Sequence, residues 1–149
     1  MLADRARERC VAVDLAADQR GVVGLPRLGD RPRREARGRL AGSRLLLVTS
    51  RSEGGANVVS EAIASGVPIL STRVAGSVGV LGLDYPGYFP VGDADALAAL
   101  LLRAEEEGAF LAALRRGVER VLPLVDPVRE REAWRALLAE LGRAGTLRP

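Results

Sequence analysis

The most constraining feature of this sequence is a pair of apolar runs separated by a segment with helical periodicity. Residues 45–49 read Leu-Leu-Leu-Val-Thr, and residues 67–71 read Val-Pro-Ile-Leu-Ser. Short, continuous apolar runs of this kind are typical of strands that are buried on both faces of a sheet. The segment between them, residues 57–65, carries apolar side chains at helical spacing. We therefore predict a strand, a helix and a second strand, which is the repeating unit of a parallel α/β sheet.

The predicted helix has recognisable ends. Asn57 can cap its first turn, and Gly66 suits the left-handed conformation that often follows a last turn. The apolar stripe that would pack on the sheet consists of Val58, Val59, Ala62 and Ile63. Glu61 lies off this stripe, about one turn inside the helix. A carboxylate is therefore expected near the mouth that the helix start forms above the sheet.

Weaker patterns continue the alternation on both sides of this unit. Upstream, we predict strands at residues 10–14 and 21–25 and a helix over about residues 33–40. Downstream, we predict a glycine-rich loop at 76–82 and a short strand at 88–91. Asp93 or Asp95 should cap a helix that contains Leu97, Leu100 and Leu101 and runs to about Glu107, and further helices are predicted over 109–122 and 128–142. Together the elements predict a Rossmann-like, three-layer α/β domain with a parallel sheet and C-terminal helices.

Length and charge favour a single domain. The 149 residues suffice for one compact core, which we divide into a basic part, 1–42, and the main α/β part, 43–149. Residues 1–51 hold twelve arginines and six acidic residues, but no aromatic side chain that could stack on bases, so we do not expect nucleic-acid binding. No apolar leader opens the chain and no apolar run approaches membrane-spanning length, which predicts a cytoplasmic protein without a membrane span.

The residue types exclude several kinds of catalysis. All 22 basic residues are arginines, so neither an imidazole base nor a Schiff-base lysine is available. Cys10 is the single cysteine, which excludes an internal disulfide and a cysteine-based zinc site.

Residues 53–61 combine two carboxylates with a glycine turn, in the order Glu-Gly-Gly-Ala-Asn-Val-Val-Ser-Glu. A helix start offers unpaired amide groups to phosphates, and Gly54 and Gly55 let the backbone approach such a ligand closely. Glu61 can accept both hydroxyls of a ribose, and Glu53 can accept hydroxyls of a sugar beyond the phosphates. Taken singly, each glutamate is better explained as a solvated side chain. The joint pattern favours a nucleotide-sugar site.

These residues resemble a known family. Glu53-x7-Glu61, the following Gly66-Val67-Pro68 and the run Tyr-Phe-Pro-Val-Gly-Asp at 88–93 are similar to the donor-binding, C-terminal half of GT-B glycosyltransferases of the retaining family 4 type. The full run 53–61, followed by the glycine, Leu and Tyr-Pro-Gly-Tyr-Phe-Pro pattern of 76–90, narrows the resemblance to the selenosugar synthases of selenoneine biosynthesis. Those enzymes join a UDP-sugar to selenophosphate and form a selenium–carbon bond.

The resemblance implies a role for each residue of the motif. Glu53 would contact the donor sugar as the catalytic carboxylate, and Glu61 would bind the ribose. The implied substrate-binding set is Arg51, Glu53, Gly54, Gly55, Ala56, Asn57, Val58 and Glu61. GT-B enzymes generally work without a bound metal, so the resemblance implies a site that uses no metal and no cofactor. Family members use an arginine and a lysine to neutralise the diphosphate. Because this chain has no lysine, Arg51 or Arg73 is expected to supply that charge.

A GT-B enzyme reacts in the cleft between two Rossmann-like domains, whereas this sequence predicts one. We therefore expect a separate acceptor half as a partner and little activity from the isolated chain. By analogy, helix 128–142 would face that half and would otherwise leave an apolar face exposed. Two alternatives stay open. The chain could be a non-catalytic interaction module that docks through this helix, or a family 4 enzyme that acts on a glycan or lipid acceptor.

Overall fold

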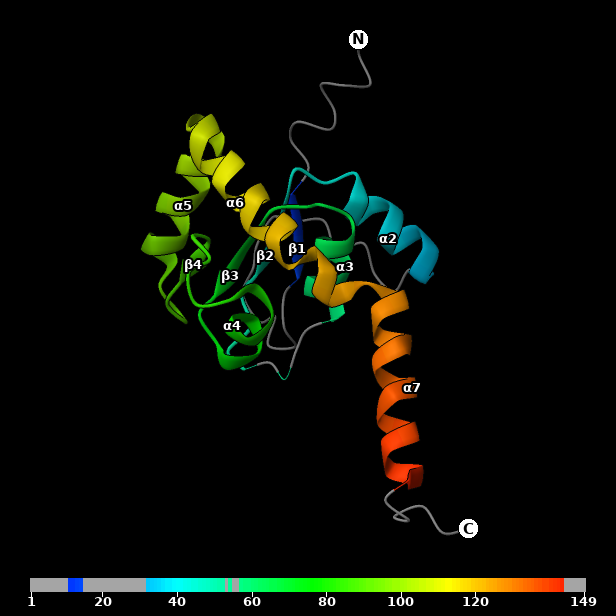
Figure 1. Ribbon diagram of the computed structural model, residues 1–149. Coiled ribbons are helices and arrows are strands. Elements are labelled where there is room, and N and C mark those ends of the chain that lie inside the picture. The colour runs from blue at the N-terminus through cyan, green and yellow to red at the C-terminus, as the bar shows by residue number, and fades with distance from the viewer. Residues whose placement is uncertain (1–10, 15–31, 53, 55–56, 144–149) are drawn as a thin grey trace.

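The computed structural model describes residues 11–14, 32–52, 54 and 57–143. Within these residues the fold is built on a parallel sheet whose strand order, β1-β2-β3-β4, follows the order of the chain (Figure 1). The strands are β1 (Val11–Asp14), β2 (Leu45–Val48), β3 (Ile69–Thr72) and β4 (Tyr88–Phe89). In the central pair, Val48 of β2 lies opposite Ser71 of β3. All carboxyl ends of the described strands therefore meet at one edge of the sheet.

Helices connect and follow the strands. They are α2 (Arg33–Ala41), α3 (Asn57–Ala64), α4 (Ala75–Leu81), α5 (Ala94–Glu106), α6 (Gly108–Val121), the 3-10 helix η1 (Leu122–Val125) and α7 (Pro127–Arg143). Crossovers between parallel strands are right-handed, so a strand order that follows chain order places successive crossover helices on the same face. Consistent with this, α3 contacts both α2 and α4, and α6 packs against α3 and α4. These observations confirm the α/β, Rossmann-like class with C-terminal helices.

The core lies where β2 and β3 meet α3 and α6. Every residue of both strands is buried, which explains why their sequences lack the alternation of a strand with one wet face. From α3, the buried residues are Val59, Ala62 and Ile63, three members of the predicted stripe, while Val58 is half-buried. From α6, Leu114 and Val118 are almost fully buried. Burial of these side chains is the main force that holds the helices on the sheet.

Most predicted elements are confirmed, with shifts at their ends. Gly66 follows α3 with φ +67°, as its left-handed stop requires. Asn57 is the first helical residue of α3 rather than a residue that precedes it. The strand predicted at 88–91 ends at Phe89, since Pro90 has no amide for a further ladder bond. Asp93 caps α5 by accepting a hydrogen bond from the Ala96 amide at 2.8 Å. The strand predicted at 21–25 lies outside the described residues.

One prediction is wrong: the glycine-rich segment 76–82 is not a loop. Residues Ala75–Leu81 form α4, and the chain leaves it at Gly82 with φ +87°. Ser77 and Leu81, four residues apart, are both buried, so one face of the segment packs on the domain. Packing of that face outweighs the low helix propensity of two glycines, each of which disfavours a helix by about 1 kcal/mol relative to alanine.

A tyrosine completes the β4 edge of the sheet. Because β4 is only two residues long, the ladder on this side begins at Ser71, whose amide donates to the Gly87 carbonyl at 2.9 Å. Ile69 lies two residues earlier. The Tyr85 hydroxyl donates to the Ile69 carbonyl at 2.7 Å and accepts from the Ile69 amide at 3.0 Å. The phenol thereby replaces a strand residue as the partner of both backbone groups.

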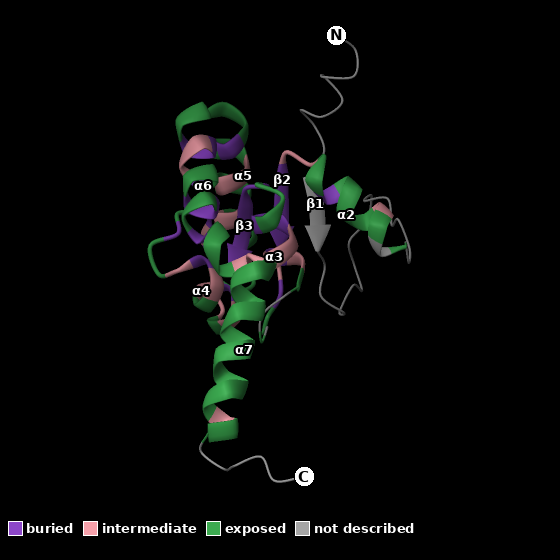
Figure 2. Ribbon diagram, turned by 45° about the vertical axis from the view of Figure 1, so that its right-hand side comes forward, coloured by how far each residue is buried: buried purple, intermediate pink, exposed green. Residues whose placement is uncertain are grey.

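Helix α7 projects from the rest of the domain (Figure 1). It carries no buried residue, and its ribbon is coloured as exposed over nearly its whole length (Figure 2). Its exposed large apolar side chains are Val128, Trp134, Leu137 and Leu138. The apolar face predicted for helix 128–142 is therefore present and uncovered within the described part of the chain.

Candidate functional site

The candidate site lies at the carboxyl edge of the sheet, above β2 and β3. In open parallel α/β sheets, ligands bind outside the carboxyl ends of the strands. Residues 49–52 leave β2 at this edge, and α3 begins there at Asn57. The first amides of α3 thus lie at the same edge of the sheet as the residues that leave β2.

Buried hydroxyl groups fix this edge. The Thr72 side chain at the end of β3 donates a hydrogen bond of 2.6 Å to the Ser50 carbonyl, just beyond β2. The hydroxyls of Ser71 and Ser77 lie 2.8 Å apart, which links β3 to α4. All four residues have at most 2% of their surface exposed. Hydrogen bonds in such an environment are costly to break, so the strand ends form a rigid base for the segments above them.

Two arginines follow the strands at this edge. Arg51 comes shortly after β2, Arg73 comes directly after β3, and both side chains are exposed. The Arg73 guanidinium lies 5.4 Å from the centre of the Tyr88 ring. The Tyr88 hydroxyl is 2.9 Å from the Gly82 carbonyl, to which it donates, so the ring is held between α4 and the arginine.

Tyr88 is an uncharged part of this arrangement at neutral pH. Burial raises the pKa of its phenol to about 12, and the nearby Arg73 charge opposes that rise only in part. The phenol therefore keeps its proton and remains a hydrogen-bond donor over the whole physiological range.

The structure describes only some of the residues predicted for the site. Glu53, Gly55 and Ala56 lie outside the described residues. Gly54 and Asn57 are exposed, and Val58 is half-buried in the first turn of α3.

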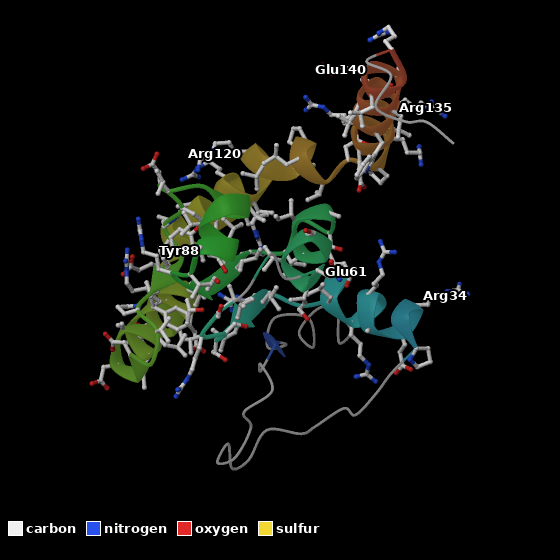
Figure 3. The ribbon with its side chains drawn as sticks, turned by 90° about the horizontal axis from the view of Figure 1, so that it is seen from below. Arg34, Glu61, Tyr88, Arg120, Arg135 and Glu140 are labelled. Atoms are coloured by element: carbon white, nitrogen blue, oxygen red, sulfur yellow. The ribbon has the colours of Figure 1, made fainter. Side chains whose placement is uncertain are left out.

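Glu61 is half-buried on α3. Figure 3 shows it well separated from Tyr88, across the width of the domain.

Sequence reasoning missed Thr72 and Tyr88. The change from apolar to hydroxyl side chains within the buried run Ile-Leu-Ser-Thr was the signal that could have pointed to Thr72.

A comparison with protein families identifies the domain. The family model described as "Glycosyl transferases group 1" matches residues 27–120, which is more than half of the chain. The chain belongs to the glycosyl transferases group 1 family. No curated protein matches it.

The group 1 match covers the elements from α2 to nearly the end of α6, and so it includes the whole carboxyl edge of β2, β3 and β4. It supports sugar transfer as the activity and the donor-binding half of a GT-B enzyme as the kind of domain. Among the described residues of this group 1 chain, no helix combines the length and apolarity needed to cross a membrane.

Proposed function

We propose that this group 1 domain binds the nucleotide-sugar donor of a retaining glycosyltransferase. The observation that carries the proposal is the start of α3 at the carboxyl edge of a rigid β2–β3 pair. In the sequence, Glu53 precedes this helix start by four residues. A diphosphate placed there meets the unpaired amides and the positive dipole end of the helix. Exposed Gly54 and Asn57 leave that approach open.

Each carboxylate has its own part in the proposal. Glu61 accepts hydrogen bonds from the two ribose hydroxyls, and Glu53 contacts the donor sugar next to the bond that breaks. Backbone groups of Gly55, Ala56 and Val58 complete the cradle, and Arg51 contributes positive charge. A charged carboxylate that binds a diol instead of a phosphate avoids repulsion with the diphosphate.

Within the family, we propose a UDP-sugar as donor and selenophosphate as acceptor. The sequence 53–61 together with the pattern of 76–90 supports this narrower choice. In the transfer, the bond between the sugar carbon and the diphosphate oxygen breaks, and a carbon–selenium bond forms on the same face of the sugar. The leaving diphosphate can assist the incoming nucleophile on that face, so the step needs positioning and charge stabilisation and no histidine.

The acceptor side of a GT-B enzyme is formed by a second domain, and we propose that such a domain contacts α7. Trp134 and Leu138 on α7 are more than half exposed, and Leu137 nearly so, which supports a protein contact along this helix. The same observation favours the second candidate function, an interaction module that docks through α7 without catalysis. Donor binding separates the two, because only the first function requires it.

The test is a titration of UDP and 2′-deoxy-UDP by calorimetry. We expect wild type to bind UDP more tightly than the deoxy compound, because the deoxy compound lacks one of the hydroxyls that Glu61 would bind. Glu61→Gln should reduce this preference, whereas Glu119→Gln, on the exposed face of α6, should preserve it. No heat with UDP or UDP-sugars at millimolar concentration, with or without an acceptor domain, would refute donor binding.

A further inference from the structure

The chain leaves β2 through a point that a side chain ties to β3. Backbone pairing of the two strands extends as far as Val48 and Ser71. Two residues further on, the Ser50 carbonyl accepts a hydrogen bond of 2.6 Å from the Thr72 hydroxyl. Ser50 has no exposed surface, whereas Arg51 is exposed. The Thr72 hydroxyl therefore holds the chain at the residue where it passes from the core to the surface.

Thr72 is itself fixed on both sides. Its carbonyl accepts hydrogen bonds from the Val74 amide at 2.9 Å and from the Ser71 hydroxyl at 3.0 Å. The next amide, that of Arg73, donates to the Phe89 carbonyl at 2.9 Å. Because Thr72 is buried, water cannot readily compete for its hydroxyl. Its β-branched side chain has few rotamers, so the hydroxyl is a fixed donor and not an adaptable one.

The bond to Thr72 also sets the direction of one peptide group. A trans peptide is planar, and its carbonyl and amide point in opposite directions. Since the Ser50 carbonyl points at Thr72, the Arg51 amide points away from it. In the sequence, Glu53 follows Ser50 by three residues, which span at most about 11 Å. A rotation of this peptide would redirect the chain only a short distance before the proposed donor contacts.

We infer that Thr72 is a positioning residue for donor binding: its hydroxyl orients the Ser50–Arg51 peptide so that the chain approaches α3 in the conformation that binds the diphosphate. This inference rests on the proposed function. Thr72 acts through the backbone and does not itself touch the donor. Without the hydroxyl, other orientations of the peptide become accessible, and only a fraction of the molecules is ready to bind. The apparent affinity falls in proportion to that fraction.

The experiment compares Thr72→Val, Thr72→Ser and Tyr85→Phe with wild type by calorimetry, using UDP and 2′-deoxy-UDP as probes. Circular dichroism first establishes that each variant is folded. Thr72→Val should weaken the binding of both probes by the same factor, roughly threefold to tenfold, which corresponds to the net energy of one ordinary hydrogen bond. The preference for UDP should persist, because Glu61 lies within α3, whose buried side chains hold it on the core. Thr72→Ser restores the hydroxyl and should bind like wild type.

Tyr85→Phe is the matched control. It also removes a buried hydroxyl that bonds to the backbone, but its partner is Ile69, the first residue of β3, at the opposite end of the strand from Thr72. It deletes two hydrogen bonds, whereas Thr72→Val deletes one, and it should leave the UDP affinity unchanged. A general effect of lower stability would therefore appear in Tyr85→Phe, whereas a positioning effect would appear only at Thr72.

Several results would overturn the inference. They are a wild-type UDP affinity in folded Thr72→Val, an equal loss in Tyr85→Phe, no recovery in Thr72→Ser, or a smaller preference for UDP over the deoxy compound in Thr72→Val. If Thr72→Val does not fold, Thr72→Cys takes its place. A thiol is a weaker donor than a hydroxyl, so this variant should bind UDP less tightly than Thr72→Ser, and equal affinities would contradict the inference. Absence of UDP binding by wild type would instead overturn the proposed function, and the role of Thr72 with it.

Discussion

Removing the Tyr85 hydroxyl tests how the short β4 edge is stabilised. In Tyr85→Phe the ring stays, together with its edge-on contact to Tyr88 at 5.6 Å between ring centres. The change deletes the two hydrogen bonds to Ile69, at 2.7 and 3.0 Å. Ile69 has no exposed surface, so water cannot readily replace the hydroxyl at either backbone group.

The expected cost follows from these two groups. A buried backbone group without a partner costs about 1–3 kcal/mol, so losing both partners should lower the free energy of unfolding by about 2–6 kcal/mol. That is a large share of the total stability of an ordinary domain, about 5–15 kcal/mol. In Tyr88→Phe, the matched control, the lost hydroxyl is on a half-buried side chain, and the expected cost is about 1 kcal/mol.

Urea denaturation followed by circular dichroism measures both values. With slopes of about 1–3 kcal/mol per molar urea, Tyr85→Phe should unfold at a midpoint lower by about 1 M or more, with an unchanged slope. Tyr88→Phe should shift the midpoint by a fraction of that. If Tyr85→Phe unfolds within experimental error of Tyr88→Phe, the Tyr85 hydroxyl does not complete the sheet in the way described.

Three further predictions concern the same framework. Thr72→Val keeps the shape of the side chain but removes the hydrogen bond that the hydroxyl donates to the Ser50 carbonyl. It should therefore cost about 1–3 kcal/mol and weaken UDP binding in calorimetry, whereas Thr72→Ser should restore both. Gly117→Ala should destabilise the fold by more than 1 kcal/mol in urea, because the new methyl carbon would lie 2.6 Å from the Tyr85 ring. Gly108→Ala is its control, because a methyl carbon there would meet nothing within 4 Å outside its own stretch of helix. Equal effects of the two substitutions would contradict this reasoning. Burial raises the pKa of Tyr88 from 10.0 to about 12, so the folded state holds this proton more tightly than the unfolded chain. The free energy of unfolding should be independent of this group below about pH 10 and fall as pH rises from 10 to 12. Tyr88→Phe should reduce that fall in urea titrations across this range.

The sequence predicted the elements whose signal is local. The continuous apolar runs at 45–49 and 67–71 and the helical stripe of 57–65 are visible in neighbouring residues, and the structure confirms all three elements. The α4 helix could not be predicted in this way. Its glycines argue against a helix, and only the contacts of Ser77 and Leu81 with the domain reverse that preference.

For the candidate site, too, some features have a local sequence signal and others depend on contacts between distant residues. The order of strand, glycine turn and helix predicted a donor site at the start of α3, and both that position and the roles of Glu53 and Glu61 stay predictions. Arg51 was part of the predicted substrate-binding set, whereas the sequence offered Arg73 only as another possible source of positive charge. The contact of Arg73 with Tyr88 depends on a residue fifteen positions further along the chain.

The sequence by itself determined the α/β class, because hydrophobic patterns and helix ends are properties of neighbouring residues, and it predicted a type of ligand chemistry through the glutamate–glycine motif. Only the tertiary structure decided which side chains stabilise the edge of the sheet and which arginine is held there. Those outcomes depend on the register of parallel strands, which brings Ser50 to Thr72 and Ile69 to Tyr85. Contacts between residues so far apart in the chain leave no periodic trace in its sequence.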